Sequence, residues 1–71
     1  MTGREWIDAY AAKLGVAAPD EATVEALLDI AGVAAHASER TAAPAACWLA
    51  AKTGRTLEES LAAAWRVGAE A

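Results

Sequence analysis

Two polar residues, His36 and Arg40, stand four residues apart and are followed by a segment that begins with Pro44. Residues at this spacing lie on one face of a helix. Proline is favoured at the first position of a helix, where unpaired backbone N–H groups point outward and attract anions. We therefore predict an anion site in which the N–H groups of Ala45 and Ala46 meet a phosphate or a carboxylate. Arg40 would add a bidentate contact, and His36 a hydrogen bond or a proton.

The same residues also fit a purely structural role, which is the more frequent one for a single histidine on a polar helical stripe. His36 would then donate to a backbone carbonyl between helices, and Arg40 would pair with Glu39 or Asp29. Water would satisfy the N–H groups at the start of the following helix. The spacing alone does not separate this alternative from the anion site.

The chain lacks the residue patterns of an autonomous enzyme. It contains no glycine-rich nucleotide loop, no zinc-protease motif and no paired carboxylates. Cys47, the single cysteine, lies in an uncharged segment, where a thiol behaves as a small hydrophobic group. With one histidine and one cysteine, a metal site would depend on carboxylates, and these are not clustered. We predict no catalytic residue, no metal and no cofactor.

The charge balance bears on which partners the chain could have. The formal net charge is −4, and the six lysines and arginines are scattered along the sequence. Nucleic-acid binding needs a basic face, so we expect none. The longest uncharged run, residues 41–51, is too short to span a membrane, and no signal peptide is visible. These features predict a soluble cytoplasmic protein without a membrane segment.

Helix signals divide the chain into four segments. Thr2 with Glu5, and Thr56 with Glu59, fit the capping box that opens a helix. Asp20 or Thr23 would cap the second helix, and glycines at 15 and 54 would end the first and third. We predict an all-α fold, a compact bundle of four short helices at about 3–14, 22–38, 44–53 and 57–69, forming a single domain over residues 1–71.

Alanine dominates the hydrophobic residues, and there are three tryptophans but no phenylalanine. Because alanine contributes little buried area, we expect Trp6, Tyr10, Trp48 and Trp65 to anchor the core together with the leucines. The helix at 44–53 carries no charge from Ala45 to Ala51, so it is expected to be the most buried. Gly32, inside the second helix, indicates a close approach by a neighbouring helix or a ligand.

Short segments spread over nearly the whole chain form a recognisable set. They are Trp6-Ile7, Leu14-Gly15-Val16, Leu27-Leu-Asp29-Ile-Ala31, Ala35-His36, Arg40, Ala42-Ala-Pro44 and Gly54-Arg55. In these segments the chain resembles a family of small all-helical domains of unknown function from high-GC bacteria. Such domains occur alone or appended to nucleotidyltransferases similar to molybdenum-cofactor guanylyltransferase. The resemblance implies an accessory role in molybdenum-cofactor nucleotide metabolism and carries over no catalytic residue.

Three functions are consistent with these observations. The leading hypothesis is a non-catalytic accessory or interaction domain that docks onto a nucleotidyltransferase-type enzyme or another molybdenum-cofactor pathway protein. The first alternative is a small binder of a phosphorylated or carboxylated metabolite at His36, Arg40 and the helix that starts at Pro44. The second alternative is a self-associating structural module, a homodimer, because small alanine-rich bundles often need extra burial.

Overall fold

Helix starts and stops encoded in the sequence determine the architecture. The computed structural model describes residues 1–70, apart from the side chains at positions 68 and 70; Ala71, the last residue of the predicted domain, lies outside the described residues. The elements in this part of the chain are α1 (Gly3–Leu14), α2 (Glu21–Ala37), α3 (Ala42–Lys52) and α4 (Leu57–Glu70). The predicted all-α bundle of four helices is confirmed. Its radius of gyration, 12.8 Å, is close to the roughly 11 Å expected for a compact chain of this length.

Capping boxes open α1 and α4. At α1 the Thr2 hydroxyl accepts the Glu5 N–H at 3.1 Å, and Glu5 Oε1 accepts the Thr2 N–H at 2.7 Å. At α4 the Thr56 hydroxyl accepts the Glu59 N–H, and Glu59 Oε1 accepts the Thr56 N–H, both at 3.1 Å. Each box satisfies two backbone donors that the helix itself leaves unpaired. Both motifs predicted from the sequence are therefore confirmed.

These boxes make helix stability sensitive to acid. Hydrogen bonds from Thr56, first from its backbone N–H and then from its hydroxyl, lower the pKa of Glu59 below its usual value of 4.5, and bonds from Thr2 do the same for Glu5. A lowered folded-state pKa means that the stabilisation is complete above about pH 4.5 and is lost as the pH falls through the folded value.

We therefore expect the midpoint of thermal unfolding to fall as the pH is lowered below about 4.5, measured by far-ultraviolet circular dichroism. The Thr56→Ala substitution removes the hydroxyl that donates to the Glu59 carboxylate and accepts the Glu59 N–H. The fall in the unfolding midpoint that is due to Glu59 should therefore be smaller in this variant. An unchanged acid dependence in Thr56→Ala would contradict this assignment.

The remaining helix ends follow the same logic. Asp20 Oδ1 accepts the Thr23 N–H at 2.8 Å, so Asp20 is the residue that caps α2. Gly15 ends α1 with φ +74°, and Gly54 follows α3 with φ +75°. Left-handed backbone of this kind strains any residue with a Cβ, which is why glycine stands at both stops.

The start of α3 differs from the prediction. The Ala42 N–H donates to the Glu39 carbonyl at 2.9 Å, and the Ala43 N–H donates to the Arg40 carbonyl at 3.1 Å. These turn bonds lead into a helix that begins at Ala42, two residues before the predicted first residue Pro44. Proline is still tolerated there because the third helical position needs no N–H donor. The N–H of the fifth position, Ala46, in contrast, has a carbonyl acceptor one turn earlier within the same helix, at Ala42.

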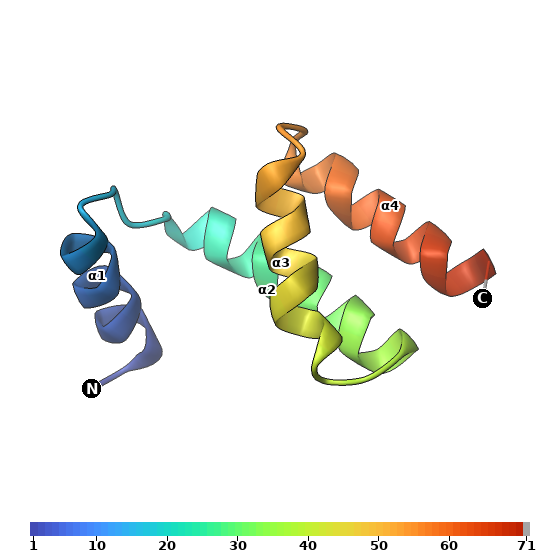
Figure 1. Ribbon diagram of the computed structural model, residues 1–71, viewed down its shortest axis with the longest axis horizontal. Coiled ribbons are helices and arrows are strands. Elements are labelled where there is room, and N and C mark those ends of the chain that lie inside the picture. The colour runs from blue at the N-terminus through green and yellow to red at the C-terminus, as the bar shows by residue number, and fades with distance from the viewer. Residues whose placement is uncertain (71) are drawn as a thin grey trace.

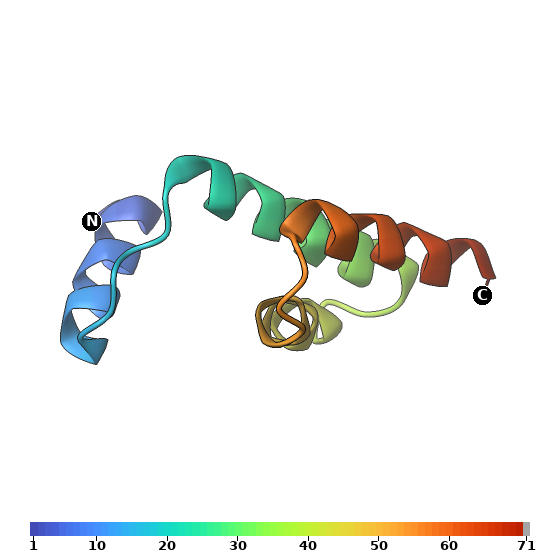
Figure 2. The same ribbon diagram turned by 90° about the horizontal axis from the view of Figure 1, so that it is seen from above.

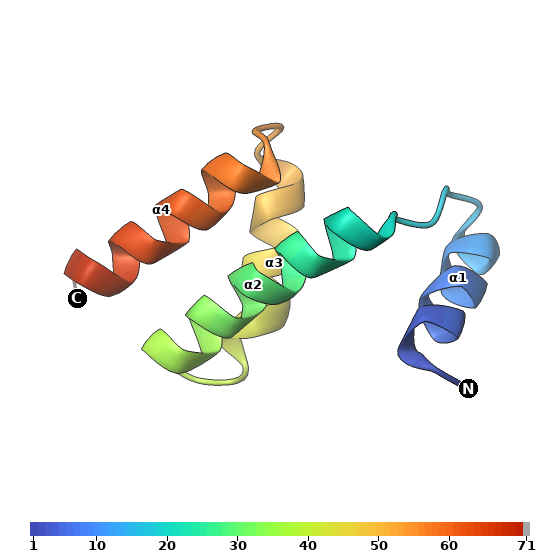
Figure 3. The same ribbon diagram turned by 180° about the vertical axis from the view of Figure 1, so that it is seen from behind.

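The helix α2 is the centre of the arrangement. Both α3 and α4 pack against α2, and they approach each other much less than either approaches α2. α4 runs in nearly the same direction as α2, and α3 crosses α2 steeply (Figures 1 and 3). From their connecting turn, α3 and α4 diverge like the arms of a V (Figure 1).

The helix α1 lies apart from this assembly. Within residues 1–70, α1 does not pack against α2, α3 or α4. The connection that follows Leu14 carries α1 beyond the N-terminal end of α2, at one end of the molecule (Figures 1 and 2). The longest dimension of the structure, 39 Å, reflects this extension.

The buried residues among those described are few and aliphatic: Ile30, Val33 and Ala50 lie on the packed helices α2 and α3, and Ala11 lies on α1. The expectation that aromatic residues anchor the core is wrong, as Trp6, Tyr10, Trp48 and Trp65 are 55%, 51%, 61% and 63% exposed. The physical reason is that only α2 has neighbours on two sides. Large side chains on the outer helices have no further layer of protein to cover them.

The expectation for α3 is also wrong. It contributes one buried residue, Ala50, whereas α2 contributes Ile30 and Val33. Leu49 and Trp48 of α3 remain more than half exposed. An uncharged helix can thus lie at the surface when the chain is too short to surround it.

Candidate functional site: a hollow between α2 and α4

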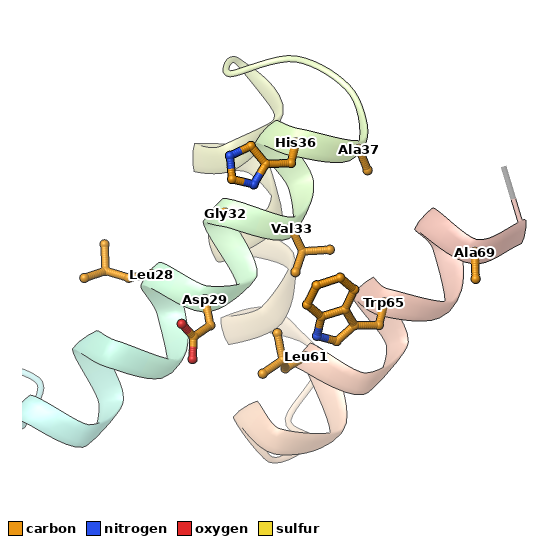
Figure 4. Close-up of a pocket in the computed structure, with 9 residues that line it drawn as sticks. All are labelled: Leu28, Asp29, Gly32, Val33, His36, Ala37, Leu61, Trp65 and Ala69. Carbon is orange, nitrogen blue, oxygen red and sulfur yellow. The ribbon is translucent and has the colours of Figure 1, made fainter.

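A hollow of about 820 Å³ lies between α2 and α4, on a side that α3 does not line. We call it the α2–α4 hollow; its lining residues are Leu28, Asp29, Gly32, Val33, His36, Ala37, Leu61, Trp65 and Ala69. Figure 4 shows that α2 supplies both polar members, Asp29 and His36, and that large apolar side chains come from both helices. The hollow is open to solvent, so it can receive a group that projects from another molecule.

Gly32 forms the floor of the hollow. A Cβ built on Gly32 would meet nothing within 4 Å, so no neighbouring helix requires a glycine there. The expected close approach of another helix is therefore absent from the described structure. Asp29 and His36 lie one turn on either side of this gap, on the same face of α2 (Figure 4). Gly32 thus leaves open space between the carboxylate of Asp29 and the imidazole of His36.

The two polar groups act separately. Asp29 and His36 are seven residues apart, which places their backbones about 10 Å apart along the helix axis. Both are exposed, and no hydrogen bond or ion pair joins them in the described part of the chain. They do not form a hydrogen-bonded acid–base pair in the described structure.

The opposite wall comes from α4. Trp65 lies across the hollow from α2 with its ring beside Val33 and above Leu61 (Figure 4). Trp65 is 63% exposed, and Leu28 on the α2 side is 64% exposed. A half-exposed tryptophan beside an aliphatic wall is a surface that an apolar side chain of a partner can cover. The sequence-based prediction put Trp65 in the core and so missed this wall; the signal was the i, i+4 spacing of Leu61 and Trp65.

The residues predicted to bind an anion fall on different surfaces. His36 lines the α2–α4 hollow, whereas Ala45 and Ala46 line a separate groove beside α3. Arg40 is exposed and lines neither of these two depressions. The described residues contain no ion pair between Arg40 and either Glu39 or Asp29. The structure therefore does not gather the four predicted residues into one pocket.

The groove beside α3 has a volume of about 590 Å³. We call it the α3–α4 groove, and α2 forms its floor. Its lining residues are Ile30, Val33, Ala34, Ala37, Ser38, Ala42, Ala45, Ala46, Leu49, Ala50, Thr53, Ser60, Ala63, Ala64 and Val67. None of these residues is charged, and more than half are alanine. The groove is thus less polar than the α2–α4 hollow.

The single cysteine makes a contact between two helices. The Cys47 thiol donates to the Leu27 carbonyl at 3.6 Å, a contact that joins α3 to α2. Among the described residues, no cluster of three or more His, Cys, Asp or Glu side chains is placed to hold a metal ion. Nor does any helix in residues 1–70 have the combined length and hydropathy needed to cross a membrane.

Gly32 offers a direct test of the hollow's geometry. Gly32→Ala is expected to raise the free energy of unfolding by about 0.5–1 kcal/mol, because alanine is the better helix former. The new methyl group has open space, so no clash offsets the gain. Denaturant titration measures this change. A loss of stability would mean that a neighbour closes over Gly32, and the hollow would not exist in solution.

Comparison with known proteins places the chain in a family. No curated protein matches it, and no solved structure does. A family model described as Domain of unknown function (DUF6457) matches residues 1–70. Because the match spans nearly the whole chain, this protein belongs to the DUF6457 family.

Proposed function

We propose that this chain is a non-catalytic interaction domain that docks onto a partner protein through the α2–α4 hollow. The observation that carries the proposal is the pair of large apolar side chains, Trp65 and Leu28, that line the hollow while being more than half exposed. Tryptophan is among the residues that most often dominate binding energy at protein interfaces. Covering this pair would give a partner a favourable burial of apolar area.

The hollow also specifies what the partner presents. An apolar side chain of the partner would lie over Gly32, between Trp65 and α2. A lysine or arginine next to it would meet Asp29 at the edge of the hollow. The net charge of −4 favours the approach of a basic surface. The matching partner surface is therefore an apolar projection flanked by positive charge.

The class of partner comes from the family resemblance set out above. We propose a nucleotidyltransferase similar to molybdenum-cofactor guanylyltransferase, or another protein of that pathway. The separation of Asp29 and His36 supports an accessory role, because the hollow has no pair of groups that could transfer a proton. The chemistry would belong to the partner, and this domain would position or regulate it.

Titration calorimetry tests the proposal with the full chain and a purified nucleotidyltransferase of this type from the same genome. We expect saturable binding with a negative heat-capacity change, because apolar surface is buried. Absence of binding would overturn the proposal.

Parallel titrations with inorganic phosphate and GTP test the anion-site alternative. We expect no saturable heat with either ligand. Phosphate or GTP binding that Arg40→Ala abolishes would favour the metabolite binder instead.

A further inference from the structure

The helix α1 has an apolar face with nothing against it. Trp6, Tyr10 and Leu14 are 55%, 51% and 58% exposed and follow one another at four-residue spacing. The Trp6 and Tyr10 rings are already paired, with centroids 4.9 Å apart. On the other side of the helix, Arg4 Nε and Asp8 Oδ1 lie 3.2 Å apart in an exposed ion pair. α1 is thus a preformed amphipathic helix whose apolar side lacks a partner in the described structure.

The α3–α4 groove is an apolar surface that could receive such a helix. α3 and α4 diverge from their connecting turn (Figure 1), and none of the helices within residues 1–70 fills the groove between them. Ile30 and Val33 of α2 lie at its floor, while Leu49 and Val67, 57% and 67% exposed, stand at its edges. Small alanines on both walls would let another helix approach closely. An incoming helix needs large apolar side chains to fill such a groove.

The helix α1 and the groove match in size and chemistry. The 11 residues of α3, which lines the groove from Ala42 to Ala50, span about 17 Å of helix, and the 12 residues of α1 span about 18 Å. Large aromatic side chains on α1 would meet alanines in the groove. Neither surface places a charge against the other, since the apolar face of α1 and the groove lining are both uncharged.

The connection between α1 and α2 directs α1 away from its own groove. The Gly15 and Val16 N–H groups donate to carbonyls of the last turn of α1, at 3.1 and 3.0 Å. Asp20 is held at the other end by its cap bond to the Thr23 N–H. The short stretch between them includes Pro19, whose ring restricts the backbone. With both ends fixed, α1 lies past the N-terminal end of α2 (Figures 1 and 2). The groove is lined by residues from Ile30 to Ala37, in the C-terminal half of α2.

We propose that two copies of this chain exchange α1 helices, each α1 docking in the α3–α4 groove of the other copy. Half-exposed side chains of this size would each bury about 100 Å² more. The three residues of α1 and an equal area of the groove would together bury about 600 Å² in each contact. The two reciprocal contacts of the dimer would therefore bury about 1,200 Å². This area is at the lower end of the range for specific interfaces, so the dimer should dissociate on dilution.

Sedimentation equilibrium of the full chain tests the exchange. We expect a dimer at high micromolar concentration and at least a tenfold weaker association for Trp6→Ser and for Leu49→Ser. Trp48→Ser is the matched control, because Trp48 neighbours Leu49 and is 61% exposed but lines no part of the groove. All three substitutions are at exposed positions, so helix content by circular dichroism should stay the same.

Mixing the two defective variants tests reciprocity. Trp6→Ser chains keep an intact groove, and Leu49→Ser chains keep an intact α1. Each heterodimer therefore has one contact without a defect, whereas both contacts of each homodimer carry one. We expect more dimer in the mixture than in either variant alone. The proposal would be overturned if the wild-type chain were a monomer at all concentrations. This outcome includes the case in which α1 folds back into the groove of its own chain. A dimer unaffected by Trp6→Ser and Leu49→Ser would overturn it equally.

The α3–α4 groove shares only Val33 and Ala37, both on α2, with the proposed docking site. The α3–α4 groove and the α2–α4 hollow lie on different sides of α4, which turns Leu61 and Trp65 to the hollow and Ser60, Ala64 and Val67 to the groove. Loss of the dimer in Leu49→Ser therefore leaves the hollow intact. Failure of one proposal does not entail failure of the other.

Discussion

Replacing Ile30 with alanine is expected to lower the free energy of unfolding by about 2–5 kcal/mol. Ile30 is 2% exposed, the lowest value in the described core, and lies on the helix against which both α3 and α4 pack. Truncation removes the apolar contacts of this buried side chain and leaves a cavity. In a domain of this size, whose total stability is only a few kcal/mol, such a loss should leave the chain largely unfolded at room temperature.

Ile7→Ala is the matched control for this substitution. Ile7 is the same residue type on α1, half-buried, and its helix does not pack against α2, α3 or α4 within residues 1–70. We expect a loss below about 1 kcal/mol, measured by urea titration at the lowest concentration that the far-ultraviolet signal allows. An equal loss from both variants would show that α1 belongs to the same packed core, contrary to the described arrangement.

Truncation of Trp65 is expected to produce the largest change in partner binding. Trp65 forms the α4 wall of the hollow, and removing its ring takes away the surface that an apolar group of the partner would cover. A dominant interface tryptophan contributes about 2 kcal/mol or more, which corresponds to a loss of affinity of about 30-fold. Titration calorimetry of Trp65→Ala with the nucleotidyltransferase measures this loss.

Trp48→Ala provides the comparison for this variant. Trp48 is exposed to nearly the same degree as Trp65, 61% against 63%, but lies on α3 outside the hollow, with Lys52 Nζ 4.8 Å from the centre of its ring. We expect its affinity for the partner to remain within about threefold of the wild type. Equal losses in the two variants would mean that binding follows exposed aromatic area in general rather than the hollow.

Features that depend on neighbours along the chain could be predicted from the sequence. Each capping box involves residues three positions apart, and the left-handed stops need glycine for a local steric reason. The bounds of α1 were therefore predicted without error. The start of α3 was not, because alanines at 42 and 43 continue a turn from Glu39 as readily as they form a loop. Pro44 marks the first turn of a helix but not which residue begins it.

Features that depend on distances between helices could not be predicted in this way. The sequence places His36 and Asp29 on one stripe of α2, and the structure keeps them there. It does not reveal that Trp65 of α4 faces this stripe while Ala45 and Ala46 face a different depression. The prediction that the tryptophans are buried was wrong for the same reason, since an apolar residue is buried only where a second element covers it.

The most direct test of the docking proposal is to map amide chemical shifts of the full chain during titration with the nucleotidyltransferase. The proposal predicts that the largest changes occur at Gly32, His36, Leu61 and Trp65, including the Trp65 indole N–H. Changes concentrated on residues 40–46, or no changes at saturating partner, would contradict the assignment of the α2–α4 hollow as the docking site.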